Sequence, residues 1–184
     1  HVYLEEKLAS FFGCEQACLY SYGFSAIASA IPAYAKKGDV IFVDEAVNFA
    51  LQKALDASRS RIKFFRHNDI AHLEHLLDQH AKEEAKNPKL SKTIRKFLVV
   101  AGIYLNTGTI CNLSDMIGLK RKHKLRLFID ESVSVGVLGA SGKGITEHLN
   151  ISRDDVDLII ATLENTMGSI GGFCVGTSYV VEHQ

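Results

Sequence analysis

The sequence predicts an α/β fold in which a mostly parallel sheet is covered by helices on both faces. Short, continuous apolar runs recur along the chain, as in strands buried on both sides, and segments with helical spacing of apolar residues separate them. The 184 residues are 47% hydrophobic and 23% charged, an ordinary globular composition, and the chain is long enough to bury a sizeable core.

The first half of the chain opens with a predicted amphipathic helix. Leu4, Leu8, Phe11 and Phe12 recur at helical spacing, and Gly13 ends the pattern. The next elements are expected in this order: a strand over 17–23, a helix over 24–35 that Pro32 bends or interrupts, a strand over 40–44, a helix over 48–58 and a strand over 62–67.

The second half continues the alternation of strands and helices. A long helix over 70–85 is capped by Asn68 or Asp69, and it is followed by a strand over 97–105, a helix over 113–124 and strands over 125–130 and 156–162. The charged segment around Pro88 is interpreted as a surface excursion, so one domain accounts for the whole chain. Such alternation is typical of a parallel sheet.

Composition and spacing exclude several functions. The 21 basic and 21 acidic side chains balance, so no global field favours nucleic acid or an anionic membrane, and no run approaches the roughly 20 apolar residues of a membrane span. His72, His75 and His80 share the long helix, but their spacing does not bring metal ligands together, and we expect a solvated helix face. The cysteines lack zinc-site spacing. We therefore predict no metal site.

In an open parallel sheet, ligands bind beyond the carboxyl ends of the strands. Those ends bring together the segments 22–24, 44–48, 105–108, 130–136 and 162–172. Asp130 ends one strand and precedes a glycine-studded turn. Its carboxylate could pair with a protonated ring nitrogen or could cap the following turn, and its position alone leaves both roles open.

Three of these segments resemble motifs of the fold-type I pyridoxal-phosphate enzymes, and among them the α-oxoamine synthases, which join an amino acid to an acyl-CoA with loss of carbon dioxide. "SYGF" is similar to that family's phosphate-binding turn, "DESVSVGVLGASGKG" to its Asp-containing glycine loop, and "TLENTMGSIGGF" to the loop that carries its lysine. The match runs over essentially the whole chain, and three ordered motifs are far more specific than one glycine pattern. The resemblance implies the large domain of a fold-type I transferase.

The same resemblance implies that the catalytic groups are missing. The family's aldimine-forming lysine falls on Asn165, whose carboxamide nitrogen is not a nucleophile, so no catalytic residue is expected in this chain. The histidine that stacks on the cofactor ring falls on Asn48, and the histidine and serine that contact the ring oxygen fall on Val133 and Leu105. Ala101 stands where the family usually has Glu.

Other cofactor-binding positions of the family are retained. Gly23 and Phe24 match the turn whose amides hold the phosphate, and Thr162 matches a hydroxyl that contacts it. Asp130 matches the aspartate that keeps the pyridine nitrogen protonated. Each of these four residues also has an ordinary structural use.

Taken together, the motifs resemble the non-catalytic subunit of the family members that condense L-serine with palmitoyl-CoA to 3-oxosphinganine, the first step of sphingolipid synthesis. The resemblance implies a heterodimer with a lysine-bearing paralogue that holds pyridoxal phosphate covalently, located at the cytosolic face of the endoplasmic reticulum membrane. It also implies that residues 1–184 are the large domain of a longer protein, with an N-terminal membrane anchor and arm before His1 and a small domain after Gln184. Contact with the membrane would come only through such segments.

Two other interpretations stay open. The chain could be an active α-oxoamine synthase that uses Lys143 as its aldimine anchor, although Lys143 matches the family's basic residue in the glycine loop. It could also be a non-enzymatic scaffold protein that has left sphingolipid synthesis.

Overall fold

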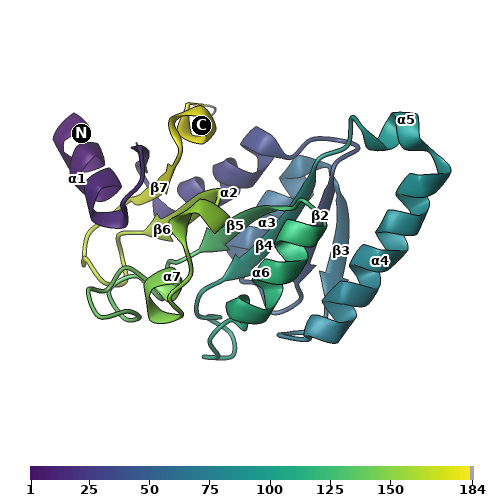
Figure 1. The fold of residues 1–184 in the computed structure, drawn as a ribbon. Helices are drawn as coiled ribbons and strands as arrows, with labels where there is room; N and C mark the ends of the chain where they lie inside the picture. The colour runs from purple at the N-terminus through teal and green to yellow at the C-terminus, as the bar shows by residue number, and fades with distance from the viewer. Residues whose placement is uncertain (183–184) are drawn as a thin grey trace.

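A computed structural model describes residues 1–182 and contains one seven-stranded sheet in the order β1-β7-β6-β5-β4-β2-β3 (Figure 1). The strands are β1 (Gln16–Tyr20), β2 (Val40–Asp44), β3 (Arg61–Phe65), β4 (Lys96–Ala101), β5 (Arg126–Asp130), β6 (Leu158–Thr162) and β7 (Gly172–Gly176). β7 runs antiparallel to its neighbours β1 and β6, whereas β3, β2, β4, β5 and β6 pair in parallel. The predicted α/β fold with a mostly parallel sheet is confirmed.

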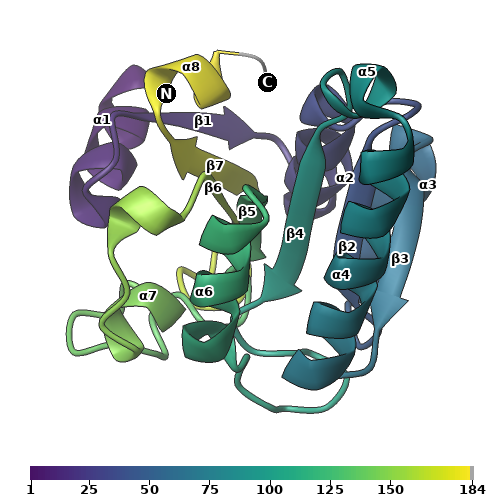
Figure 2. The ribbon, with the colours of Figure 1, turned by 45° about the vertical axis from the view of Figure 1, so that its right-hand side comes forward.

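Helices cover both faces of this sheet. They are α1 (Val2–Phe12), α2 (Gly23–Tyr34), α3 (Phe49–Ser58), α4 (Ile70–Lys86), α5 (Pro88–Ser91), α6 (Leu113–Lys122), α7 (Ile145–His148), α8 (Ser178–Val181) and the 3-10 turn η1 (Arg153–Asp155). In Figures 1 and 2, α2 and α3 lie behind the sheet, and α4 and α6 lie in front of it. Between these layers the aromatic side chains of Phe42, Phe97, Phe128 and Phe173 are fully buried. Within residues 1–182, no helix is both long enough and apolar enough to cross a bilayer.

The structure corrects several element boundaries. β7 was not predicted, because its sequence GFCVG begins and ends in glycine and directly follows a glycine loop. The strand expected over 97–105 ends at Ala101, where the chain enters a loop that an Ile103–Ile110 bridge closes. The strand expected over 17–23 ends at Tyr20, and α2 continues through Pro32 to Tyr34 without a join at the proline.

The prediction that His80 lies on a solvated helix face is wrong. Its side chain is only 3% exposed, because the ring packs against Phe42 and Nε2 lies 2.9 Å from Glu84 Oε1. Asp69, one of the two predicted caps, does cap α4, since its side chain accepts a hydrogen bond from the His72 amide.

The strand register decides which groups meet at the carboxyl edge of the sheet. Ala101 pairs with Asp130 at the ends of β4 and β5. Gly172, where β7 begins, lies between Thr162 at the end of β6 and Tyr20 at the end of β1. The first turn of α2 lies beside the end of β6, since Gly23 packs against the Thr162 side chain, although more than a hundred residues separate the two segments in the sequence.

Candidate functional site

An open pocket of about 340 Å³ lies at this carboxyl edge. Its walls come from the first turn of α2, the start of α3 and the loops that follow β4, β5 and β6. Six positions that the sequence motifs single out line it together, namely Phe24, Asn48, Leu105, Val133, Thr162 and Asn165. The pocket is therefore where the resemblance places the cofactor of the family.

The predicted phosphate turn is the N-terminus of α2. Gly23 is buried, and a Cβ at this position would collide with the side chains of Thr162 and Glu164, so only glycine fits. The Gly23 amide donates to Glu164 Oε1 at 3.2 Å, and the Gly171 amide donates to the same oxygen at 3.4 Å. Phe24 follows with its side chain 51% exposed, and its ring centroid lies 6.4 Å from that of Phe49.

Asp130 is buried behind the pocket, and its carboxylate is already bonded to the protein. Oδ1 accepts from the Ser132 amide at 2.9 Å and from the Ser132 hydroxyl at 2.6 Å, while Oδ2 accepts from Asn48 Nδ2 at 2.9 Å. Burial raises the pKa of Asp130, and these hydrogen bonds act in the opposite direction. Asn48 also caps α3 through Leu51, so a single side chain links that helix to the buried carboxylate.

Asn165 connects two loops. Its Nδ2 donates to the Ser132 carbonyl at 2.7 Å, and next to it the Thr166 hydroxyl donates to the Val135 carbonyl at 2.5 Å. These two hydrogen bonds thus fasten the loop after β6 to the loop after β5, at the position where the sequence resemblance places the family's lysine. Neither group of the Asn165 carboxamide can act as an amine nucleophile.

Lys143, the alternative aldimine anchor, does not line the pocket. Its Nζ lies 5.7 Å from the centroid of the Phe11 ring, on α1. The loop that contains Lys143 is held in place by Glu131, whose side chain is fully buried. The Glu131 carboxylate accepts hydrogen bonds from the Ile145 amide at 3.0 and 3.1 Å and from the Ser134 hydroxyl at 2.9 Å.

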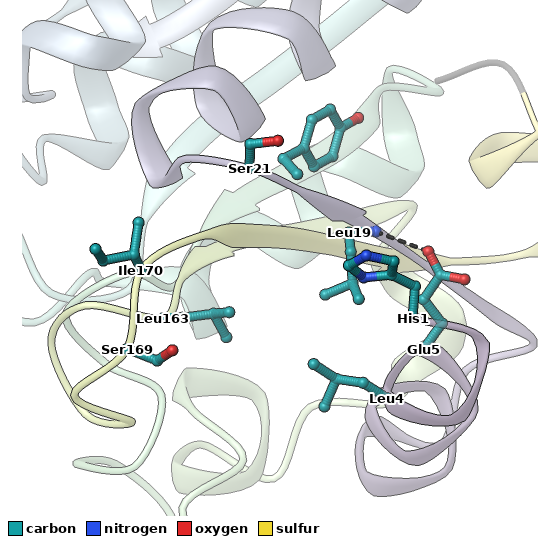
Figure 3. Close-up of a pocket in the computed structure, with 9 residues that line it drawn as sticks. His1, Leu4, Glu5, Leu19, Ser21, Leu163, Ser169 and Ile170 are labelled. Carbon is teal, nitrogen blue, oxygen red and sulfur yellow. Dashed lines mark hydrogen bonds between the residues drawn. The ribbon is translucent and has the colours of Figure 1, made fainter.

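A second pocket of about 390 Å³ lies on the other side of the 163–171 loop. Figure 3 shows Leu163 and Ser169 of this loop pointing toward the side where α1 lies, with the Glu5 carboxylate accepting from the Leu19 amide at 3.0 Å. Ile170 of the same loop also lines this pocket. The 163–171 loop is therefore a wall shared by both pockets.

Sequence reasoning missed the roles of three polar residues. Glu164 accepts from the Gly23 amide, Ser132 donates to Asp130, and Glu131 accepts from the Ile145 amide at the end of the glycine loop. An acidic residue directly before Asn165, in a loop that faces a helix N-terminus, is the one signal in the sequence that could have indicated Glu164.

Comparison with known proteins defines the class of this fold and then its family. The structure of the serine palmitoyltransferase of S. paucimobilis with a bound PLP–myriocin aldimine matches with a TM-score of 0.86 at 27% identity, over 99% of this chain and 44% of that chain. The fold is thus that of the fold-type I pyridoxal-phosphate-dependent transferases. The family model for aminotransferase class I and II matches residues 1–184, and the chain belongs to this family.

Two curated relatives are similar over the whole chain. Serine palmitoyltransferase 1 of Dictyostelium discoideum is 45% identical over 184 residues, which are 100% of this chain and 38% of that protein. Long chain base biosynthesis protein 1c of Oryza sativa subsp. japonica is 42% identical over 184 residues, which are 100% of this chain and 37% of that protein. The chain thus spans less than half the length of these relatives.

The groups that this chain offers do not fit pyridoxal phosphate in the way that the family motifs imply. Residue 165 has no primary amine, the Gly23 amide of the α2 turn already donates to a carboxylate, and both oxygens of Asp130 already have donors. Cofactor contacts by Gly23, Phe24, Thr162 and Asp130 therefore stay a prediction.

Proposed function

We propose that this chain is the large domain of the non-catalytic subunit 1 of serine palmitoyltransferase. In the complete assembly this subunit supports the condensation of L-serine with palmitoyl-CoA to 3-oxosphinganine. A lysine-bearing paralogue would hold pyridoxal phosphate covalently, and the two chains would form a heterodimer at the cytosolic face of the endoplasmic reticulum membrane. The anchor and the small domain would lie in sequence outside residues 1–184.

One observation carries this proposal: a carboxamide occupies the lysine position. Asn165 lies in the pocket at the carboxyl edge of the sheet, and its amide nitrogen is bonded to the Ser132 carbonyl. Because pyridoxal-phosphate chemistry of this family starts from an amine, a chain without one needs a partner that supplies it. The similarity to proteins named serine palmitoyltransferase 1 supports the same role.

The chain's own residues would then act as support. Asn165 and Thr166 fasten the loops after β5 and β6 to each other, and Asn48 links α3 to Asp130. The loops after β4, β5 and β6 carry exposed apolar side chains at the same edge as the pocket, Leu105, Val137, Met167 and Ile170 among them. In the proposed role, this ordered edge positions the neighbouring subunit and excludes water from the shared site.

Borohydride reduction tests the assignment of the cofactor. The full chain would be co-expressed with a lysine-bearing paralogue, saturated with pyridoxal phosphate, reduced, and mapped by peptide mass spectrometry. We expect one reduced adduct, on the motif lysine of the paralogue, and no specific adduct on this chain. A stoichiometric adduct at Lys143 would instead support the active-synthase alternative.

A further inference from the structure

The anion-binding turn at the start of α2 already holds an anion from the chain itself. Glu164 Oε1 lies 3.2 Å from the Gly23 nitrogen and 3.4 Å from the Gly171 nitrogen, and both amides donate to it. Gly23 opens a helix of 12 residues, and the N-cap residue Tyr22 contributes no side-chain hydrogen bond of its own. The carboxylate therefore supplies the acceptor that these N–H groups need.

The electrostatics of this contact favour an ionised carboxylate. Partial burial acts to raise the pKa of Glu164, but hydrogen bonds from its own amide and from the amides of Gly23 and Gly171 outweigh burial, and the pKa is lowered. Glu164 is therefore negatively charged at neutral pH. Helix N-termini attract carboxylates and phosphates for the same reason, through exposed N–H groups and the helix dipole.

The space around the Gly23 backbone is also narrow. A Cβ at Gly23 would collide with the side chains of Glu164 and Thr162, and a Cβ at Gly172 would lie within 3.0 Å of the Gly23 Cα. A phosphate that accepted from the Gly23 and Gly171 amides would have to displace the carboxylate, since two like charges at one pair of donors repel each other.

We propose that the Glu164 carboxylate replaces a cofactor phosphate in this chain, closing the anion-binding turn from within and fixing the 163–171 loop to α2 without any cofactor. The proposal deepens the supporting-subunit role and rests on it only for the identity of the excluded ligand. Its consequence is an interface loop that is already ordered before assembly, because its anchor is covalently part of the chain.

The test uses 4-deoxypyridoxine 5′-phosphate, which lacks the aldehyde and cannot form adducts with surface lysines, and unphosphorylated 4-deoxypyridoxine as its partner probe. The full chain, its Glu164→Ser variant and a Glu74→Ser control would be compared by equilibrium dialysis. Glu74 is exposed on α4, far from the turn in sequence. We expect Glu164→Ser to bind the phosphorylated probe at least about tenfold more tightly than the unchanged chain and the control, with no gain for the unphosphorylated probe.

Amide hydrogen exchange gives a second readout. Exchange at Gly23 and Gly171 should accelerate at least about tenfold in Glu164→Ser, and the phosphorylated probe should restore protection, because each amide loses its acceptor and regains one. Glu164→Gln keeps one carbonyl acceptor and fills the turn, so it should show intermediate exchange and bind the probe less tightly than Glu164→Ser. This variant keeps the test available if Glu164→Ser folds poorly.

Three results would overturn the proposal: equal binding of the phosphorylated probe by the unchanged chain and Glu164→Ser, a gain that does not depend on the phosphate, or unchanged exchange at Gly23 and Gly171 in both variants. The paralogue takes no part in these measurements. Failure of the proposed heterodimer would therefore leave this result standing, and the reverse also holds.

Discussion

Glu131, which directly follows β5, has a buried carboxyl group, and such a group makes the free energy of unfolding depend on pH. Burial raises its pKa to about 7, assisted by the charge of Asp130, although hydrogen bonds from Ile145 and Ser134 act in the opposite direction. The folded chain therefore holds a proton that the unfolded chain, with a value near 4.5, has released. The stabilising contribution is complete below about pH 4.5 and is lost as the pH rises through about 7.

Glu131→Gln removes this titration while keeping an acceptor for the Ile145 amide. Between pH 5 and pH 8, the free energy of unfolding of the unchanged chain should fall by about 2–3 kcal/mol more than that of the variant. Urea denaturation at the two pH values measures the difference. Asp130 is present in both proteins, so its own titration cancels to first order, and parallel pH dependences would contradict this account of Glu131.

Replacing Asn165 with lysine would restore the family's nucleophilic amine, yet we expect Asn165→Lys alone to leave the isolated chain enzymatically inactive. Asn48, Val133 and Leu105 would still lack the family's ring contacts, and residues that act as a unit do not contribute additively. Serine-dependent release of carbon dioxide in the presence of palmitoyl-CoA should stay at background. Substantial turnover from this single change would show that the rest of the pocket is still competent.

At the scale of elements, the loop after β5 depends on a glycine that cannot be replaced. Gly144 has φ of 97°, in the left-handed region, and a Cβ there would overlap the buried Glu131 carboxylate. This glycine lets the chain pass close to that carboxylate and begin α7 at the next residue. The loop geometry thus comes from one backbone conformation and one buried acid together.

Gly144→Ala should therefore destabilise the chain by about 2 kcal/mol or more, because the new methyl group meets both strain and overlap. Gly118→Ala is the matched control: Gly118 is exposed in the middle of α6, has no atom within 4 Å of a built Cβ, and should gain roughly 0.5–1 kcal/mol. Chemical denaturation of both variants measures the two changes in the free energy of unfolding, which should have opposite signs. Equal effects would show that neither backbone conformation nor crowding distinguishes these positions.

At the scale of the whole molecule, hydrophobic runs were sufficient to predict the parallel part of the sheet. VIFVD and LRLFID contain little but strand-forming apolar residues, and both are strands with buried centres. β7 could not be predicted in the same way, because its glycines do not carry a strand signal: Gly172 is required by the close approach of α2, and Gly176 by that of the Asp157 carbonyl. Burial of His80 depends on the packing of α4 against the sheet, which helical periodicity alone does not give.

The sequence predicted which residues lie at the candidate site, but it did not predict the hydrogen bonds that they make. The motifs brought Asn48, Thr162 and Asn165 to one pocket, because parallel strands end at one edge. They could not show that Glu164 accepts hydrogen bonds from the amides of Gly23 and Gly171, since Gly23 lies 141 positions away and the contact with Gly171, 7 positions away, depends on the loop conformation. Only the three-dimensional structure shows that these two amides donate to a side chain of the same chain.

The measurement that most directly tests the central claim is serine-dependent release of carbon dioxide with palmitoyl-CoA, made on the full-length chain alone, on a lysine-bearing paralogue alone and on the co-purified pair. We predict activity in the pair, background release from this chain alone, and loss of the pair's activity when the paralogue's lysine is replaced. Turnover by this chain alone, or full activity of the paralogue without it, would contradict the account.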